Sequence, residues 1–460
     1  MPFLRDWEAA MPRSAPRANS RFSRTMTAVR VSIFRRIRRG ALWQSVGTGV
    51  AIQLTLLVSG PLIARMLGPS GRGELAAIMI WPAALTFFGT LGLPAGTTYA
   101  IARGRGQPRE LSRRMLKYAL LQTVVILAVQ FAVFVAVLGG RGDAVWEAAL
   151  VSLLLVPVLL AQQYGIALLQ GAQRFRLFNA ARVLPAALYA VFVVCLFALD
   201  RDSLMPIVLA WLVANAVTTL FCFVGVYAYR DTPREQAEMT DREMFSFGIR
   251  GLFVSGSPIE AVRLDQMALA IFLPAAALGT YVVGLAITNL PSFVSKSVGV
   301  VAFPTVAAEK DARKAWHMVN RYTLLDLGLS LLIVVPLFAL AGWFIPLLFG
   351  DAFEDAVVIS YLILPGTVFL SVRRVLAEGL RGLGHPGIGT VAEIVALGWL
   401  VVALSVCIPL FGVRGAAIAM TTAYAASLGV TLVGAARARR GMRIDAPEPA
   451  TAAAAGVLAR

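Results

Sequence analysis

The residues of this chain best placed to do chemistry are ionisable side chains within long apolar stretches, and most of them lie in its carboxyl-terminal half. Inserting such a charge into a membrane costs about 2.5 to 3.5 kcal/mol, so each one is a functional candidate. The interiors of the amino-terminal stretches carry no ionised residue apart from Arg182, at the mouth of one of them. The later stretches carry the cations Arg263, Lys296, Arg373 and Arg374 and the acids Glu260, Asp265, Asp326, Glu378 and Glu393.

The four cations suit an anionic substrate. A guanidinium offers a fork that matches phosphate oxygens, and an ammonium offers a point charge. At about 1.5 Å per residue they would form a staggered ladder through the membrane. We therefore predict that they bind a diphosphate headgroup: Arg263, Lys296, Arg373 and Arg374.

Other interpretations of the same charges stay open. Glu260 and Arg263 are three residues apart, and Arg374 and Glu378 four, so each pair can neutralise itself on one helix face. Four side chains are near enough to the interface to extend their charged ends into it: Lys296, Asp326, Glu378 and Glu393. The candidate coupling or pairing acids are Glu260, Asp265, Glu378 and Glu393. Arg65 and Arg103 flank stretches at opposite faces, as candidate gate residues or ordinary interface anchors.

The apolar stretches indicate an all-α polytopic membrane protein. Each is about long enough to cross a hydrocarbon core of ~30 Å, which needs roughly 20 helical residues. We predict about twelve transmembrane helices: 43–64, 75–100, 118–138, 145–168, 178–199, 204–228, 249–272, 278–303, 323–348, 356–380, 388–411 and 413–435.

Basic residues set the predicted orientation, because Lys and Arg in short loops favour the cytoplasm. Of 42 such residues, only five lie in alternate loops on one side: Arg65, Arg72, Arg141, Arg201 and Arg414. The tails and the other loops carry nearly all the rest. We expect both termini to be cytoplasmic. Most of the net charge of +17 comes from this asymmetry, so no nucleic-acid partner is needed to explain it.

An internal repeat suggests two halves. LGPSGRGELA (67–76) and LPAAALGTYV (273–282) share their spacing, with Gly73 matching Gly279. Because the offset equals six predicted helices, both halves share one orientation, as parallel repeats do. The predicted parts are a basic tail (1–40), a six-helix bundle (41–228), a cytoplasmic linker (229–248), a second bundle (249–436) and a tail (437–460).

Enzymes and metal sites are not indicated. The chain has no phosphate-binding G-x-x-x-x-G-K-[ST] loop and no G-x-S-x-G motif, and its outer loops are too short for a catalytic site. Its three cysteines and two histidines have no metal-ligand spacing. We predict a non-enzyme with no cofactor and no metal.

Several motifs together resemble one family. They are LIARMLGPSGRGELA at the first hairpin, LLQGAQRFRLFN after the fourth stretch, RLDQ (Arg263 to Gln266), LGTYVVG with AFP (302–304), LFGDAF, LPG and GLRGLGHP. In order and spacing the chain is similar to polysaccharide-lipid flippases (O-antigen flippase-like) of the multidrug/oligosaccharidyl-lipid/polysaccharide exporter superfamily.

The resemblance implies two six-helix bundles around a central cavity that opens alternately to each side. It implies that a polyprenyl-diphosphate oligosaccharide moves to the outer leaflet of a bacterial cytoplasmic (inner) membrane, for cell-surface polysaccharide or lipopolysaccharide synthesis. Membrane lipids, a polysaccharide polymerase and glycosyltransferases are the implied partners. The alternatives are a cation-coupled multidrug exporter of the same fold and a non-transporting scaffold of a glycan-assembly complex.

Overall fold

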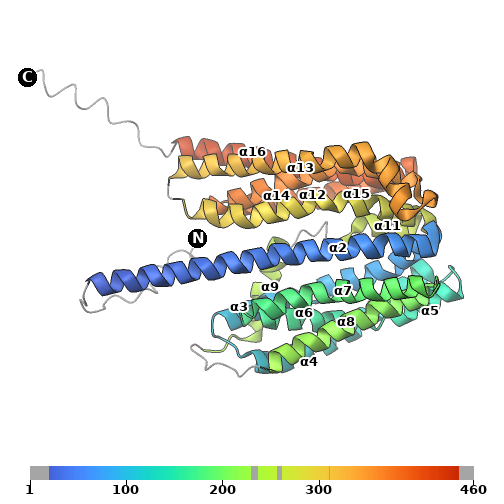
Figure 1. Ribbon diagram of the computed structural model, residues 1–460, viewed down its shortest axis with the longest axis horizontal. Coiled ribbons are helices and arrows are strands. Elements are labelled where there is room, and N and C mark those ends of the chain that lie inside the picture. Colours follow the sequence, from blue (N-terminus) through green and yellow to red (C-terminus); the bar gives the residue numbers. More distant parts are fainter. Residues whose placement is uncertain (1–19, 229–236, 256–261, 310, 445–460) are drawn as a thin grey trace, which may run out of the picture. The chain divides into compact units, whose positions relative to one another are not determined.

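The computed structural model describes residues 20–228, 237–255, 262–309 and 311–444, and every regular element within these ranges is a helix (Figure 1). The helices are α2 (Ser20–Gly89), α3 (Leu93–Ala102), α4 (Pro108–Leu138), α5 (Asp143–Ser152), α6 (Leu155–Gly171), α7 (Phe175–Ala198), α8 (Leu204–Tyr227), α9 (Asp241–Ser255), α11 (Leu264–Phe272), α12 (Ala275–Ala307), α13 (Ala312–Phe349), the 3₁₀ turn η1 (Asp351–Phe353), α14 (Asp355–Gly382), α15 (Pro386–Phe411) and α16 (Val413–Ile444). The chain divides into two units, Met1–Gly47 and Thr48–Arg460, and every site described below lies in the second.

The predicted polytopic membrane fold is confirmed. Among the described residues nine helices are long and apolar enough to cross a membrane, or ten if the bent pair within α12, Ala275–Asn289 and Val294–Ala307, forms one span. Other predicted spans are divided. The predicted helix 75–100 falls partly in α2 and partly in α3, because Leu91 (φ 50°) and Gly92 (φ 72°) adopt left-handed backbone between them.

Two further breaks position the functional residues. Gly68 (φ 63°) interrupts α2 and separates the first two predicted spans, a conformation that glycine adopts without penalty. The predicted helix 249–272 is also interrupted: Arg263 has left-handed backbone (φ 51°) and α11 begins after it at Leu264, whereas residues 256–261 lie outside the described ranges. α9 also begins at Asp241, within the range expected to be a linker, because Thr240 and Glu243 form a capping box in which each side chain bonds the other's backbone N–H.

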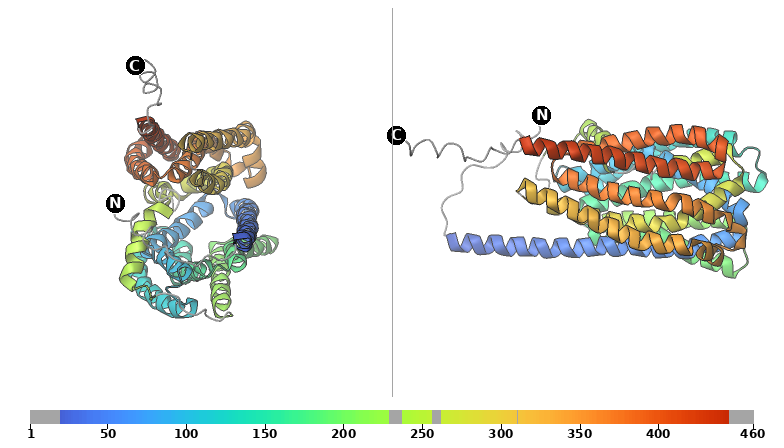
Figure 2. Two further views of the ribbon diagram at one scale, coloured as in Figure 1. Left: turned by 90° about the vertical axis from the view of Figure 1, so that its left-hand side faces the viewer. Right: turned by 90° about the horizontal axis from the view of Figure 1, so that it is seen from above.

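The helices pack in two groups, which we call the N-half (residues 48–228) and the C-half (residues 262–309 and 311–444) (Figures 1 and 2). In the N-half α6 packs against α3, α4, α7 and α8, and in the C-half α14 packs against α12, α13, α15 and α16. α9 packs on α3 of the N-half, whereas α11 packs on α12, α15 and α16 of the C-half. The chain therefore passes from one half to the other between α9 and α11.

The buried cores show where the halves are joined. We call the end with the basic loops the basic end and the other the opposite end. At the opposite end one core contains residues of both halves, such as Ile78 and Phe134 with Leu278 and Ile363. At the basic end the cores are separate: one holds N-half residues with Met239 and Met244, and the other holds C-half residues such as Val319.

Two glycines bring the halves into backbone contact at the opposite end. A Cβ added to Gly73 would lie 1.7 Å from the carbonyl oxygen of Ala275, and one added to Gly279 would lie 2.0 Å from that of Pro69. The Cβ added to Gly73 would also lie 2.9 Å from the Gly279 backbone nitrogen, and the Cβ added to Gly279 would lie 2.9 Å from the Gly73 backbone nitrogen. The two positions matched by the sequence repeat thus meet each other, at a distance only glycine allows.

Candidate functional site

A polar pocket of about 150 Å³ lies in the C-half, and we call it the C-half pocket. It is formed by side chains of α11, α12, α14 and α16 together with the residue before α11. Its lining is Arg263, Asp265, Gln266, Leu285, Thr288, Asn289, Ser292, Lys296, Ile363, Thr367, Leu370, Met420 and Tyr424. The structure therefore brings two of the predicted substrate-binding cations, Arg263 and Lys296, to one pocket with the candidate acid Asp265.

Arg263 occupies an unusual backbone position. It is the residue before α11 and has left-handed angles (φ 51°, ψ 53°) that non-glycine residues seldom adopt and that carry a free-energy cost. The residue as a whole is exposed. Because the first N–H groups of a helix have no intrahelical partner, the start of α11 adds partial positive charge beside Arg263. Membrane transporters bind anionic groups at the N-termini of such half-helices.

Asp265 is held by a tyrosine. Its side chain is 2% exposed, and the Tyr281 hydroxyl donates a hydrogen bond of 2.7 Å to its carboxylate. Both residues are buried, Asp265 on α11 and Tyr281 on α12. This bond fixes α11 against α12, the helix that carries Lys296.

Arg72 adds a cation that sequence reasoning missed. Its positive charge is close enough to Arg263 to act on it, and it also lies near Tyr189. Its guanidinium Nε is buried and has no hydrogen-bond partner among the described residues. The sequence placed Arg72 in an outer loop, but it lies within α2 after the Gly68 break. Only contact between the halves brings Arg72 toward Arg263, so no local sequence signal could reveal it.

Arg373 and Arg374 lie elsewhere on α14. Arg373, which is 5% exposed, donates from Nη2 to the carboxylate of Glu393 on α15 and forms an ion pair with it. Arg374 faces α12, where its Nη1 donates to the Ser292 carbonyl oxygen (3.3 Å) and the Ser295 hydroxyl (3.1 Å). Neither arginine lines the C-half pocket. Arg374 does reach its wall, because Ser292 is one of the lining residues.

The other candidates are dispersed. The Glu378 carboxylate lies 3.6 Å from the Arg381 guanidinium, and Glu260 lies outside the described residues. Arg65 donates from Nε to the Leu348 carbonyl oxygen (2.9 Å) and from Nη2 to that of Leu347, so it ties α2 to the end of α13. The guanidinium of Arg103 lies 5.6 Å from the centre of the Tyr99 ring.

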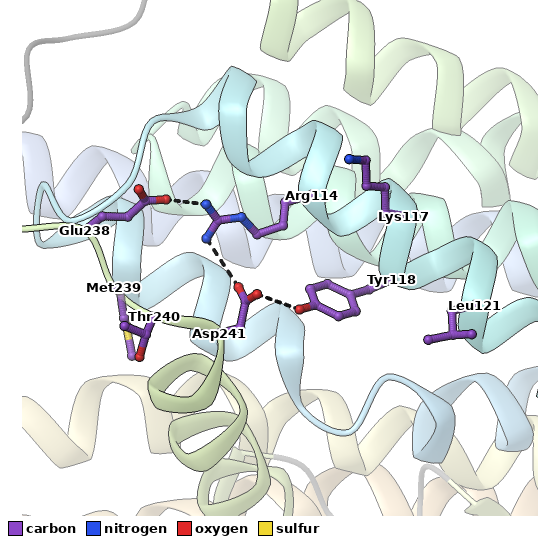
Figure 3. A pocket seen from close by; sticks show the side chains of 8 residues that line it. All are labelled: Arg114, Lys117, Tyr118, Leu121, Glu238, Met239, Thr240 and Asp241. Atoms are coloured by element: carbon purple, nitrogen blue, oxygen red, sulfur yellow. Dashed lines mark hydrogen bonds and ion pairs between the residues drawn. The ribbon is translucent and has the colours of Figure 1, made fainter.

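A second cavity, of about 640 Å³, lies at the basic end of the N-half (Figure 3). Arg114 of α4 bonds Glu238 and Asp241, and the Tyr118 hydroxyl donates to the Asp241 carboxylate at 2.7 Å. The pKa of the Glu243 carboxyl is lowered, because the Thr240 backbone N–H and the Arg105 guanidinium both donate to it. These contacts fasten the start of α9 to the N-half.

Known structures share this fold. The match to an inward-facing multidrug resistance MATE family transporter of the MOP superfamily covers 87% of this chain and 100% of that transporter's chain, with a TM-score of 0.64 and 16% identity. The lipid II flippase MurJ, in an inward closed conformation, gives a TM-score of 0.66 at 10% identity over 84% of this chain and 87% of its own. A MOP superfamily transporter from Pyrococcus furiosus Vc1 (DSM3638) gives 0.59 at 17% identity over 86% of this chain and 95% of its own. The chain therefore has the same fold as these two transporters and this flippase.

The family follows from the sequence. The profile described as "Polysaccharide biosynthesis protein" matches residues 37–310, more than half of the chain, and the chain belongs to that family. This confirms the resemblance. A curated relative, the uncharacterized membrane protein MJ1068 of Methanocaldococcus jannaschii (strain ATCC 43067 / DSM 2661 / JAL-1 / JCM 10045 / NBRC 100440), is 28% identical over 190 residues. That alignment spans 40% of this chain and only 37% of the relative.

Proposed function

We propose that this chain is a flippase that moves a lipid-linked oligosaccharide of the polyprenyl-diphosphate class from the inner to the outer leaflet of a bacterial cytoplasmic membrane. Both termini are then cytoplasmic and the basic end faces inward. Membership of the polysaccharide biosynthesis family supports a substrate of this kind.

The observation that carries the proposal is the joint placement of Arg263 and Lys296 in the C-half pocket. A guanidinium and an ammonium lining one pocket, beside the positive start of α11, match a ligand with several negative oxygens. The pocket is too small for an oligosaccharide, so we assign to it the diphosphate and place the glycan and lipid outside it. Arg72 adds positive charge from the N-half.

The joined and separated cores fit one state of an alternating-access cycle. The halves share a core at the opposite end and have separate cores at the basic end, as expected of a transporter that loads from the basic end. Transport then requires the contacts at Gly73 and Gly279 to open. An inside-negative membrane potential favours outward movement of each negative charge by about 2.3 kcal/mol per 100 mV, so a diphosphate needs no nucleotide hydrolysis.

The test is a deletion strain complemented with variants, in which accumulated lipid-linked intermediates are identified by mass. Wild type should clear the intermediate, and Arg263→Ala should let it accumulate while membrane abundance stays near normal. Arg263→Lys should restore transport only in part, because it lacks the bidentate fork. Arg313→Ala, which removes an exposed arginine at the start of α13, is the matched control. Full clearance by Arg263→Ala would remove the C-half pocket from the substrate path.

Proteoliposomes test the driving force separately. With lipid-linked substrate on one face, transport should accelerate when the membrane potential favours anion movement toward the opposite end. Equal rates with and without a potential would refute the electrophoretic version while leaving the substrate assignment intact.

The second candidate function is export of cationic drugs, and Asp265 is the observation that favours it. A buried carboxylate at the pocket could pair with a drug cation. Asp265→Asn should then abolish drug resistance in cells and leave lipid-linked intermediates unchanged. The flippase proposal expects no resistance phenotype in wild type or variant.

A further inference from the structure

Between α13 and α14 lies a buried polar cluster separate from the C-half pocket. Asp326 of α13 is 0% exposed, and neither of its carboxylate oxygens has a hydrogen-bond partner among the described residues. Ser330, one turn further along α13, and Ser371 of α14 are also 0% exposed, and their hydroxyls likewise have no hydrogen-bond partner there. Buried polar atoms are normally hydrogen-bonded, so three such side chains together require an explanation.

Helix register places the three side chains at one level. α13 and α14 run antiparallel: a Cβ added to Gly379 would lie 2.8 Å from Val319 Cγ1, and one added to Gly342 would lie 3.5 Å from the Tyr361 hydroxyl. Between these two contacts, Asp326 falls opposite the turn of α14 that contains Ser371. Asp326 and Ser330 share a face of α13 because they are four residues apart.

The charges around Asp326 come from α14 and α12. Arg374 is the cation that acts on it electrostatically, yet its Nη1 donates to α12 at Ser292 and Ser295. The other charged groups on these helices face elsewhere: Arg373 bonds Glu393, Glu378 lies beside Arg381, and Lys296 lines the C-half pocket. From the sequence, one interpretation was that Asp326 extends its charged end to the membrane interface. In the structure, packing between α13 and α14 buries it.

A buried carboxylate without hydrogen bonds costs much free energy unless it is neutralised. One carboxylate and two hydroxyls supply oxygen ligands, the type preferred by hard cations, and the carboxylate can instead hold a proton. A divalent ion would leave excess positive charge beside Arg374, so a single positive charge fits best. We propose that Asp326, Ser330 and Ser371 form a buried site for one monovalent cation, Na⁺ or a proton.

The position of Arg374 links this site to the pocket. When Asp326 is an unoccupied carboxylate it attracts Arg374, and when it holds a cation that attraction is lost. Arg374 is bonded to Ser292 and Ser295, and Ser292 lines the C-half pocket. Cation occupancy therefore alters the wall of the pocket. This link rests on the transport function proposed above, whereas cation binding at Asp326 does not.

Thermal unfolding of the full-length protein in lipid nanodiscs tests binding without transport. The midpoint is measured against Na⁺, with choline as replacement, and against pH in choline alone. A ligand that binds the folded state raises the midpoint with its concentration. If the ligand is Na⁺, we expect the wild-type midpoint to rise with Na⁺ concentration at alkaline pH. If the ligand is a proton, we expect the midpoint to rise as the pH falls, whether or not Na⁺ is present.

Asp326→Asn should abolish the dependence of the midpoint on Na⁺ or pH. In choline at alkaline pH, where Na⁺ and protons are scarce, this variant should unfold at or above the wild-type midpoint, because the buried charge is gone. Ser360→Ala is the matched control: Ser360 is a fully buried serine of α14 whose hydroxyl bonds the Gly284 and Ala356 carbonyls, and its loss should leave the dependence intact. A cation dependence that persists in Asp326→Asn would overturn the proposal. So would a folded Asp326→Asn protein less stable than wild type under scarce cations, which would mark a structural ion pair with Arg374.

If Asp326→Asn does not fold, the Ser330→Ala, Ser371→Ala double variant tests the cation site instead. It keeps the carboxylate but removes both hydroxyl groups. If the ligand is Na⁺, the titration should move several-fold toward higher Na⁺; if it is a proton, the titration should move toward higher pH, because hydroxyl donors favour the charged carboxylate. An unchanged titration would overturn the site.

Discussion

Adding one methyl group at the glycine contact should open the opposite end of the molecule. Gly73 and Gly279 lie within helices α2 and α12, where alanine is a better helix former than glycine, so Gly73→Ala and Gly279→Ala should not harm either helix on its own. The new Cβ atoms would instead meet the carbonyl oxygens of Ala275 and Pro69 at 1.7 and 2.0 Å. The variants therefore act on the contact between the halves.

The magnitude follows from these distances. Ordinary non-bonded contact needs about 3.5 Å, so the backbones must separate by more than ~1 Å. Overpacking of this kind costs about 1 to 3 kcal/mol. A state in which the halves have parted at this end avoids that cost, so its population relative to the joined state should rise about 5-fold to about 140-fold.

Thiol labelling measures this shift. A cysteine replaces Ala270, which is 1% exposed in the core shared by the halves, in a background without the three native cysteines. Adding Gly73→Ala or Gly279→Ala should raise its labelling rate in nanodiscs by the factor above. Gly140→Ala is the control, since a Cβ there meets nothing within 4 Å. Rates that match this control would show that the glycine contact does not hold the halves together.

Two further predictions concern orientation and the ion pair on α14. Cysteines in the segments 141–147 or 351–355 should react with an impermeant reagent added outside intact cells, and a cysteine in 109–117 should not; the reversed pattern would invert the proposed direction of transport. Arg373→Met or Glu393→Gln alone should lower stability by about 3 to 5 kcal/mol, because each leaves a buried charge without its partner, and the double variant should lose less than the sum of the two. Additive losses in thermal unfolding would show that the two groups are not coupled.

The all-helical membrane fold could be predicted because bilayer thickness sets the length of each apolar stretch. The interruptions within these helices were harder to predict. The apolar residues on both sides of Pro258 favoured one continuous span across 249–272. The structure begins a new helix after Arg263, with left-handed backbone that hydropathy does not encode.

The charged residues could be found from the sequence, but the helix face from which each side chain points could not. Four cations were expected on one surface, and the structure separates them by helix face: Arg263 and Lys296 line the C-half pocket, whereas Arg373 turns to Glu393. Neighbouring residues on a helix point about 100° apart, so a small error in register changes which group faces a pocket. Arg72 escaped notice for another reason, since its approach to Arg263 depends on packing between distant segments.

Under the proposed function, the place of Arg263 in the chain couples binding to movement. α9 packs on the N-half and α11 on the C-half, so Arg263 lies at the crossing from one half to the other. Arg72 of the N-half carries a like charge that acts on Arg263 in this joined state, and we expect the repulsion to fall when the halves part. Under the proposed function, a diphosphate beside Arg263 offsets that repulsion and stabilises the joined state. Once the diphosphate moves off Arg263 within the cavity, the repulsion returns and favours opening of the opposite end. Arg72→Ala should therefore weaken the effect of substrate on labelling at position 270, and an undiminished effect would exclude Arg72 from the coupling.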